Sequence, residues 1–410
     1  MNGRGNLNPE KRNILIFSTA DWDNPFWTNK QHMAVLFAKR GYRVLYVDSL
    51  GLRRPTLRRR DMGRIARRLC QAIPIARQVR PNLWRVSPIA LPIHQSAAAR
   101  ALNTRLLRAA LNWHLACLKM PSPLIWTYNP VIADLCASIP NSGIVYHCVD
   151  DLGAAPRIDG AVIAAGEKHL GTVSGLCFAT STLLRERMRG LFPRVFYEPN
   201  VCDQAFFETA RAMPSPPFDL VGIPRPRILF VGALSEYKVD YSLMETLAGR
   251  NPAMHWVLIG PVGEGQPDSR QPPLLPNIHV LGPRAYGQLP YFMAHCDAAA
   301  LPVPRNAYTE AMFPMKFFEF LAAGLPLVGS RLPALREFET LYFASDSAEE
   351  FQDNLVRVLK GQRRDRKAID KACRHHSWEA RFTRMEAVLD KVFPVPKIVA
   401  AQLAGRAVYA

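Results

Sequence analysis

Residues 13–48 decide the fold, and they read NILIFSTADWDNPFWTNKQHMAVLFAKRGYRVLYVD. An apolar run at 13–18 leads into a polar and aromatic loop, then into a helical stretch that ends at Gly41, and a second apolar run follows at 43–48. This alternation predicts a strand–helix–strand unit. Because it continues along the chain, we expect the N-terminal half to be a parallel sheet covered by helices. The further apolar runs lie at 123–129, 143–149, 175–180 and 194–200.

A proline-rich stretch separates this half from a second series of alternating segments. Residues 211–226 contain five prolines and no helical period, which is typical of a linker. The alternation restarts at 227–232, and a length of 410 residues favours two domains. We therefore predict an α/β protein with two Rossmann-like, doubly wound parallel-sheet domains that face a cleft. Its predicted parts are an N-terminal domain at 1–210, a linker at 211–226, a C-terminal domain at 227–376, and a terminal helix with a tail at 377–410 that packs back across the cleft.

The chain is strongly basic, with 52 Lys and Arg against 34 Asp and Glu and a formal charge of +18. Such a charge favours anionic partners, which include nucleic acid, an anionic membrane surface and phosphate-bearing substrates. Residues 53–68 carry eight arginines and one aspartate with apolar residues between them, a pattern that suits an anionic membrane surface. A solvated loop would look the same, and no nucleic-acid-binding module accompanies the segment.

The eight cysteines show no metal-ligand spacing, and several lie in apolar runs. They predict free thiols in a reducing compartment. No signal peptide and no run of about 18 apolar residues is found in the sequence, so we expect a cytoplasmic protein that is at most peripheral at the inner face of the plasma membrane.

The sharpest chemical motif is FPMKFFEFLAAGLP at 313–326. Pro314 suits the first turn of a helix and Gly324 its C-terminal cap. Lys316 in the first turn opposes the helix dipole unless an anion lies near, so the exposed N–H groups and this ammonium predict a phosphate site. Glu319 follows on the same face, where its carboxylate can accept hydrogen bonds from sugar or ribose hydroxyls. The alternative is an ordinary Lys–Glu surface pair.

This motif, P-x-K-x-x-E-x-x-A-x-G-x-P-x-V, resembles the donor-binding helix of the family-four-like (group 1) glycosyltransferases of bacterial polysaccharide and cell-envelope biosynthesis. The resemblance implies the GT-B fold, a nucleoside-diphosphate sugar as co-substrate, and no metal or other cofactor. It also implies that Lys316 contacts the donor diphosphate and that Glu319 contacts the nucleotide ribose. The family often has another Glu eight positions before the second, but Ala311 stands there with Glu310 beside it, so the choice between retention and inversion stays open.

Further donor residues follow from the same resemblance. Gly232 ends an apolar run and begins the loop that lies under the donor phosphates in these enzymes, although any tight turn after a strand favours glycine. Lys238 in this loop is a second candidate for binding the phosphates. Arg305, in the loop before the Lys316 helix, is a further candidate for the diphosphate.

The N-terminal domain offers candidates for the acceptor side. Asp150 and Asp151 follow a strand-like run, and either carboxylate could act as the base of an inverting enzyme or could cap the next helix. Trp22, Trp27 and His32 lie in the loop and helix after the first predicted strand, where they contact the acceptor or serve in packing.

Two shorter strings complete the set of motifs. The string Asp21-Trp22-Asp23 has the form of the metal-binding signature of the other glycosyltransferase architecture, but it follows the first strand, so we expect no metal there. Asn200 and Asp203 resemble an N-G-V-D segment of the family, with Val201 in place of the glycine.

Together these features predict a hexosyltransferase-type enzyme that moves a sugar from a nucleotide sugar to a lipid-linked or polysaccharide hydroxyl. A sugar-nucleotide epimerase of the same architecture is one alternative, although the arginine-rich segment on the acceptor side favours transfer. A non-catalytic, basic nucleic-acid-binding protein is another, but it leaves the Lys316–Glu319 helix unexplained. We expect a nucleotide sugar, a glycan or lipid-linked acceptor and an anionic membrane as partners, and no nucleic acid.

Overall fold

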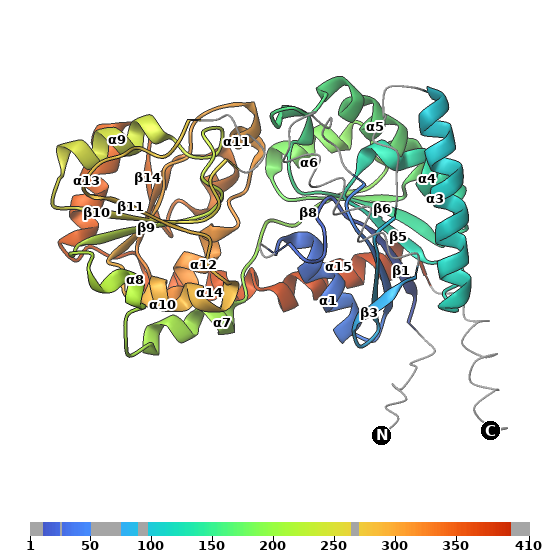
Figure 1. Ribbon diagram of the computed structural model, residues 1–410, viewed down its shortest axis with the longest axis horizontal. Coiled ribbons are helices and arrows are strands. Elements are labelled where there is room, and N and C mark those ends of the chain that lie inside the picture. The colour runs from blue at the N-terminus through green and yellow to red at the C-terminus, as the bar shows by residue number, and fades with distance from the viewer. Residues whose placement is uncertain (1–10, 25–26, 51–74, 89–96, 264–269, 395–410) are drawn as a thin grey trace.

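The computed structural model describes residues 11–24, 27–50, 75–88, 97–263 and 270–394. Two α/β domains lie side by side, each built on one sheet with helices on both faces (Figure 1). The predicted pair of Rossmann-like domains is confirmed. The arginine-rich residues 53–68 lie outside the described residues.

The N-terminal sheet has eight strands in the order β3-β4-β2-β1-β5-β6-β7-β8. Its neighbouring strands pair in parallel, except β3 and β4, which form an antiparallel edge. The strands are β1 (Asn13–Phe17), β2 (Arg43–Val47), β3 (Arg77–Arg80), β4 (Leu83–Val86), β5 (Leu124–Thr127), β6 (Gly143–Cys148), β7 (Leu176–Ala179) and β8 (Val195–Tyr197).

The C-terminal sheet has six strands, all parallel, in the order β11-β10-β9-β12-β13-β14. The order reverses beside β9, and in such sheets ligands bind where the strands on either side of the reversal end. The strands are β9 (Arg227–Val231), β10 (His255–Ile259), β11 (Ile278–Gly282), β12 (Ala298–Leu301), β13 (Leu327–Ser330) and β14 (Phe343–Ser345).

Helices connect successive strands and cover both sheets, as parallel pairing requires. Those of the N-terminal domain are α1 (Asn29–Lys39), α3 (Ala97–Cys117), α4 (Ala133–Ser138), α5 (Gly160–Val173) and α6 (Thr182–Arg189), with 3₁₀ turns η1 (Pro130–Ile132) and η2 (Leu152–Ala154). The remaining ones are α7 (Gln204–Glu208), η3 (Thr209–Ala212), α8 (Phe218–Val221), α9 (Tyr241–Arg250), η4 (Tyr286–Gln288), α10 (Leu289–Ala294), α11 (Ala307–Ala311), α12 (Lys316–Ala323), η5 (Pro333–Phe338), α13 (Ala348–Leu359), α14 (Arg366–His375) and α15 (Trp378–Val392).

The chain crosses between the domains twice, and the two crossings are paired. The backbone N–H of Cys202 donates to the carbonyl of His376 at 3.1 Å, and that of Trp378 donates to the carbonyl of Cys202 at 3.2 Å. Beyond this point α15 packs against the N-terminal domain, where Phe382 and Leu389 join its buried core (Figure 1). The predicted return of the terminal helix is confirmed.

The proline-rich residues 211–226 lie against the C-terminal domain. Leu220 and Ile223 are buried in its core, and the buried Arg227 guanidinium donates hydrogen bonds to the carbonyls of both. Apolar side chains between the prolines fasten this stretch to the domain instead of leaving it exposed. We therefore place the first passage between the sheets at 198–203, earlier than the prolines suggest.

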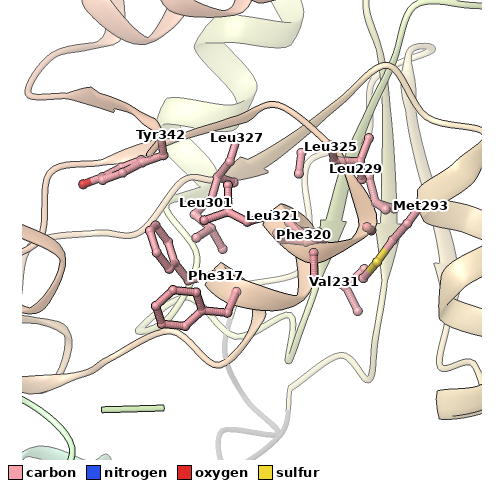
Figure 2. Close-up of a cluster of buried hydrophobic side chains, with 14 of the residues drawn as sticks. Leu229, Val231, Met293, Leu301, Phe317, Phe320, Leu321, Leu325, Leu327 and Tyr342 are labelled. Carbon is pink, nitrogen blue, oxygen red and sulfur yellow. The ribbon is translucent and has the colours of Figure 1, made fainter. Parts of the chain in front are cut away.

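Helix α12 sits deep in the C-terminal domain. Its Phe317, Phe320 and Leu321 pack against Val231 and Leu301 from the ends of β9 and β12 (Figure 2). The helix begins at Lys316, two residues after Pro314, and it ends at the predicted cap Gly324, which is in the left-handed conformation with φ +90°. This packing fixes the first turn of α12 at the carboxyl edge of the sheet.

None of the helices among the described residues is both long and apolar enough to cross a bilayer. The seven cysteines among the described residues are free thiols, and of these seven only Cys117 is exposed.

Candidate active site

The first turn of α12 places a buried ion pair at the predicted donor site. The Lys316 ammonium lies 2.6 Å from a carboxylate oxygen of Glu319, whose side chain is only 3% exposed, while that of Lys316 is 21% exposed. Burial raises the pKa of Glu319, and the neighbouring Lys316 opposes that rise. A surface pair would not be buried in this way. The Lys316 cation is instead partly exposed, and the Glu319 carboxylate is buried beside it.

Lys316 also lies beside residues of the N-terminal domain. His32 of α1 stacks on Trp378 with 4.5 Å between ring centroids, and it lies 5.9 Å from Tyr286. Burial, and then the charge of Lys316, lowers the pKa of His32 to about 3. The imidazole is therefore neutral at neutral pH and can accept a hydrogen bond from a ligand hydroxyl.

Tyr286 was not predicted from the sequence. It belongs to the C-terminal domain and lies beside His32 and Lys316. The Lys316 ammonium lies over its ring at 5.7 Å, and Phe206 stacks against it at 5.2 Å. Its hydroxyl is buried and has no hydrogen-bond partner among the described residues. A buried donor of this kind is usually paired, so the Tyr286 hydroxyl is a candidate ligand contact.

The other two aromatic candidates differ in burial. Trp22 is 8% exposed, packs edge-on against Tyr46, and donates its backbone N–H to Asp48. These contacts favour a packing role for Trp22. Trp27 is half-buried, and its ring lies 5.5 Å from the His32 ring, so Trp27 remains a candidate contact of the acceptor.

The two candidate bases occupy different surroundings. Asp150 accepts a hydrogen bond from the hydroxyl of Tyr308 at 3.0 Å, across the space between the domains. Asp151 forms an ion pair with Arg187 at 2.6 Å within the N-terminal domain. Only Asp150 thus contacts the donor domain.

Tyr308 also connects Asp150 with the loop after β9. The Lys238 ammonium lies over the rings of Tyr237 and Tyr308 at 5.2 and 5.8 Å. Asn306, the N-cap residue of α11, donates to the carbonyl of Tyr237 at 3.0 Å and holds the two loops together. Lys238 and Asp150, predicted separately, therefore lie on either side of one tyrosine.

Arg305 does not join this group. Its guanidinium forms an ion pair with Asp346, and its side chain is 61% exposed. The charge of Arg305 is thus offset by Asp346, without a donor diphosphate. Among the described residues, no group of three or more His, Cys, Asp or Glu side chains is placed to hold a metal ion.

Two glycines bring the ends of β9 and β10 together. The N–H of Gly232 donates to the carbonyl of Ile259 at 2.9 Å, and Gly260 has φ +151°. A Cβ atom on Gly260 would lie 1.8 Å from the carbonyl oxygen of Gly232. Gly260, which the sequence did not single out, therefore allows the close approach that shapes the predicted phosphate loop.

We expect Gly260→Ala to destabilise the fold by about 2–3 kcal/mol and to distort this loop, because backbone atoms must move to admit the methyl group. The matched control is Gly232→Ala, whose Cβ would first meet the ring of Phe230 at 3.1 Å. That ring can shift, so a loss below about 1 kcal/mol is expected. Urea denaturation of the two variants measures the difference, and equal losses would contradict this account.

Comparisons with known proteins concern the region that carries this site and the fold of the chain. Residues 225–361, which contain β9 to α13, match the family model of the group 1 glycosyl transferases. A curated relative is the putative teichuronic acid biosynthesis glycosyltransferase TuaH of Bacillus subtilis (strain 168), 33% identical over 114 residues. The matched stretch covers 28% of this chain and 28% of that relative.

Solved structures resemble the whole chain at low sequence identity. Sucrose-phosphate synthase of Thermosynechococcus elongatus is 15% identical, with a TM-score of 0.68 over 93% of this chain and 99% of its own. Trehalose-6-phosphate synthase of E. coli, bound with UDP-2-fluoro glucose, is 13% identical, with a TM-score of 0.59 over 94% of this chain and 100% of its own. Anabaena HepE, in complex with UDP and glucose, is 14% identical, with a TM-score of 0.54 over 98% of this chain and 100% of its own. Residues 225–361 therefore match the group 1 glycosyl transferases, and the chain as a whole has the two-domain GT-B fold of these solved structures.

Proposed function

We propose that the protein transfers a sugar from a nucleoside diphosphate, bound on the C-terminal domain, to a glycan or lipid-linked hydroxyl on the N-terminal domain. The observation that carries the proposal is the Lys316–Glu319 pair, buried at the first turn of α12 and facing the N-terminal domain. A bound diphosphate gives Lys316 the anion that its place near the positive end of the helix requires. The relative named for teichuronic acid biosynthesis supports a polysaccharide acceptor.

The chemistry assigns a role to each group. The acceptor oxygen forms a bond to the anomeric carbon, the bond from that carbon to the phosphate oxygen breaks, and the nucleoside diphosphate leaves. Lys316 and Lys238 offset the charge that develops on the leaving diphosphate, and Glu319 accepts hydrogen bonds from the ribose. His32 and Trp27 line the acceptor side, and Tyr286 faces them from the donor side. If configuration is inverted, Asp150 takes the acceptor proton.

The site proposed here needs no metal, because cations and a helix N-terminus supply the positive charge at the leaving group. We place the enzyme in the cytoplasm, at the inner face of the membrane that carries its acceptor. The seven described free thiols and the basic charge of the chain support this location.

The two aspartates provide a test of the acceptor side. We expect Asp150→Asn to lower kcat about a hundredfold, because the acceptor hydroxyl loses its base while size and hydrogen bonding are kept. Asp151→Asn should reduce kcat only a few-fold, since it weakens the pair with Arg187 at some distance from the acceptor.

The assay uses a UDP-sugar and a lipid-linked glycan, with NMR of the first-formed product reading its anomeric configuration. UDP comes first because two of the similar solved structures hold UDP compounds. An inverted product and selective loss in Asp150→Asn support the assignment. A retained configuration, or equal losses in both variants, excludes Asp150 as the base.

A further inference from the structure

Helix α3 lies on the outer side of the N-terminal domain, away from the C-terminal domain (Figure 1), and large apolar side chains are exposed along it. Its inner face is accounted for, since Leu107, Leu111 and Leu115 are buried in the domain core. The opposite face carries Leu102, Leu106 and Trp113, whose exposed fractions are 47%, 55% and 53%. With the exposed Ala109 and Cys117, these residues form the outer stripe of α3.

The spacing shows that the outer stripe is continuous. Its members stand at intervals of three or four residues from 102 to 117, which places them on one side of a helix. Isolated exposed leucines are common on protein surfaces, but an aligned row with a tryptophan marks an interaction surface.

The charges beside the stripe all have one sign. Arg105 lies beside it and Arg108 lies further round the same side of the helix, both are exposed, and the 21 residues of α3 contain no Asp or Glu. A helix with apolar residues on one side and arginines beside them binds in the interface of a membrane that contains anionic lipids. Tryptophan prefers this interface because its ring is apolar and its N–H is polar.

The same charges disfavour a second copy of the chain as the occupant. Two α3 helices packed through their outer stripes would bring together two helices that carry arginines and no acid to offset them. We infer that α3 is a docking surface that lays its outer stripe into an anionic lipid bilayer.

Helix α8 offers a matched control. It also exposes large apolar side chains, Phe218 at 91% and Val221 at 64%, but its Asp219 pairs with Arg284 and it belongs to the other domain. If any exposed apolar pair caused membrane binding, changes in α8 and in α3 would have equal effects.

The test is vesicle flotation of the full chain with phosphatidylcholine vesicles that contain or lack 30% phosphatidylglycerol. The wild type should float only with the anionic vesicles. Leu106→Asp/Trp113→Ser should bind them at least tenfold more weakly, and Phe218→Asp/Val221→Ser should bind within twofold of the wild type. If the α3 variant does not fold, Arg105→Gln/Arg108→Gln replaces it, with a loss of roughly tenfold expected from two interfacial charges.

A label on the outer stripe locates the contact. Cys117 is the one exposed thiol among the described cysteines, so an environment-sensitive fluorophore on it in a Cys70→Ser background reports the surroundings of α3. Anionic vesicles should shift its emission to shorter wavelength and shield it from an aqueous quencher. Flotation without this shift would place the contact elsewhere and overturn the inference.

A lipid-free dimer that the α3 substitutions dissociate would assign the surface to a second copy instead. Binding of UDP, measured without lipid, should be the same in all these variants. The docking surface and the donor site can therefore fail independently.

Discussion

Lys316→Ala is expected to lower kcat/KM by roughly 10²–10³, the cost of removing one charge stabiliser from a leaving group in a site closed to water. Lys316 lies at the first turn of α12, between the buried carboxylate of Glu319 and the ring of Tyr286. Without it, the helix N–H groups remain but the diphosphate loses its cation. Steady-state rates with a UDP-sugar measure the loss.

The same substitution changes the pH dependence of stability, which allows a structural effect to be recognised. Burial raises the pKa of Glu319 and Lys316 opposes this, so the pKa rises further in Lys316→Ala. A carboxyl whose folded-state pKa lies above its unfolded value is tolerated at low pH and costs stability as the pH rises through the folded value. We therefore expect the variant to lose stability, relative to the wild type, as the pH rises above the usual range of a carboxyl pKa.

The matched control is the double variant Lys316→Ala/Glu319→Gln, which removes the buried charge as well. It should show no loss of stability from position 319 as the pH rises, because glutamine does not titrate, while its catalytic rate stays low. A double variant with a restored rate would show that Lys316 serves only to neutralise Glu319.

Arg381→Ala is expected to cost about 3–5 kcal/mol of unfolding free energy, because it opens a cavity and leaves several buried acceptors unpaired. Arg381 is 0% exposed, and burial lowers the pKa of its guanidinium to about 10. It donates to Asn29 Oδ1 at 2.7 Å and to the Glu198 carbonyl at 3.1 Å, and it lies 2.8 Å from Nε2 of His147. This one side chain therefore fastens α15 to α1, to β6 and to the crossing segment.

The network around Arg381 continues to the other domain. Asn29 donates to Asn200 Oδ1 at 2.9 Å, and Asn200 donates to the carbonyl of Phe313 at 2.7 Å, just before α12. Loss of Arg381 should thus also weaken the connection between the crossing segment and the donor helix.

Arg384→Ala is the control for Arg381→Ala. Arg384 is on the same helix and lies 2.8 Å from the Glu198 carboxylate, but its side chain is 30% exposed, so a cost of about 1 kcal/mol or less is expected. Guanidinium denaturation monitored by tryptophan fluorescence compares the two variants. Similar losses would show that the buried network contributes no special stability.

The fold was readable from the sequence because it rests on local patterns. Apolar runs and helical stretches alternate along both halves, and Gly324 ends α12 where the sequence indicates. The antiparallel pair β3–β4 was missed, since its strands are short and rich in arginine: RQVR and LWRV. The passage between the domains was predicted too late, because prolines indicate irregular backbone and give no information about what Leu220 and Ile223 pack against.

The site was only partly readable, because its remaining contacts join distant residues. Arg381 and Asn29 are 352 positions apart, and Tyr308 and Asp150 are 158 apart. The sequence offered Asp150 and Asp151 as equals, and the structure distinguishes them through Tyr308 and Arg187. An aromatic residue shortly before the donor helix, in what the structure shows as α11, was the signal that could have indicated Tyr308. In the same way, the positions that follow β11 and β10 could have indicated Tyr286 and Gly260.

The central claim is a nucleotide-sugar site on α12, and thermal unfolding with UDP, GDP, TDP and their sugars at fixed salt tests it most directly. A ligand at 100 times its dissociation constant stabilises a protein by about 2.7 kcal/mol. We expect one diphosphate and its sugars to raise the Tm of the wild type and to leave that of Lys316→Ala unchanged. If none of these ligands raises the Tm while the chain binds nucleic acid with a steep dependence on salt, the claim is contradicted and a nucleic-acid-binding protein accounts for the basic charge.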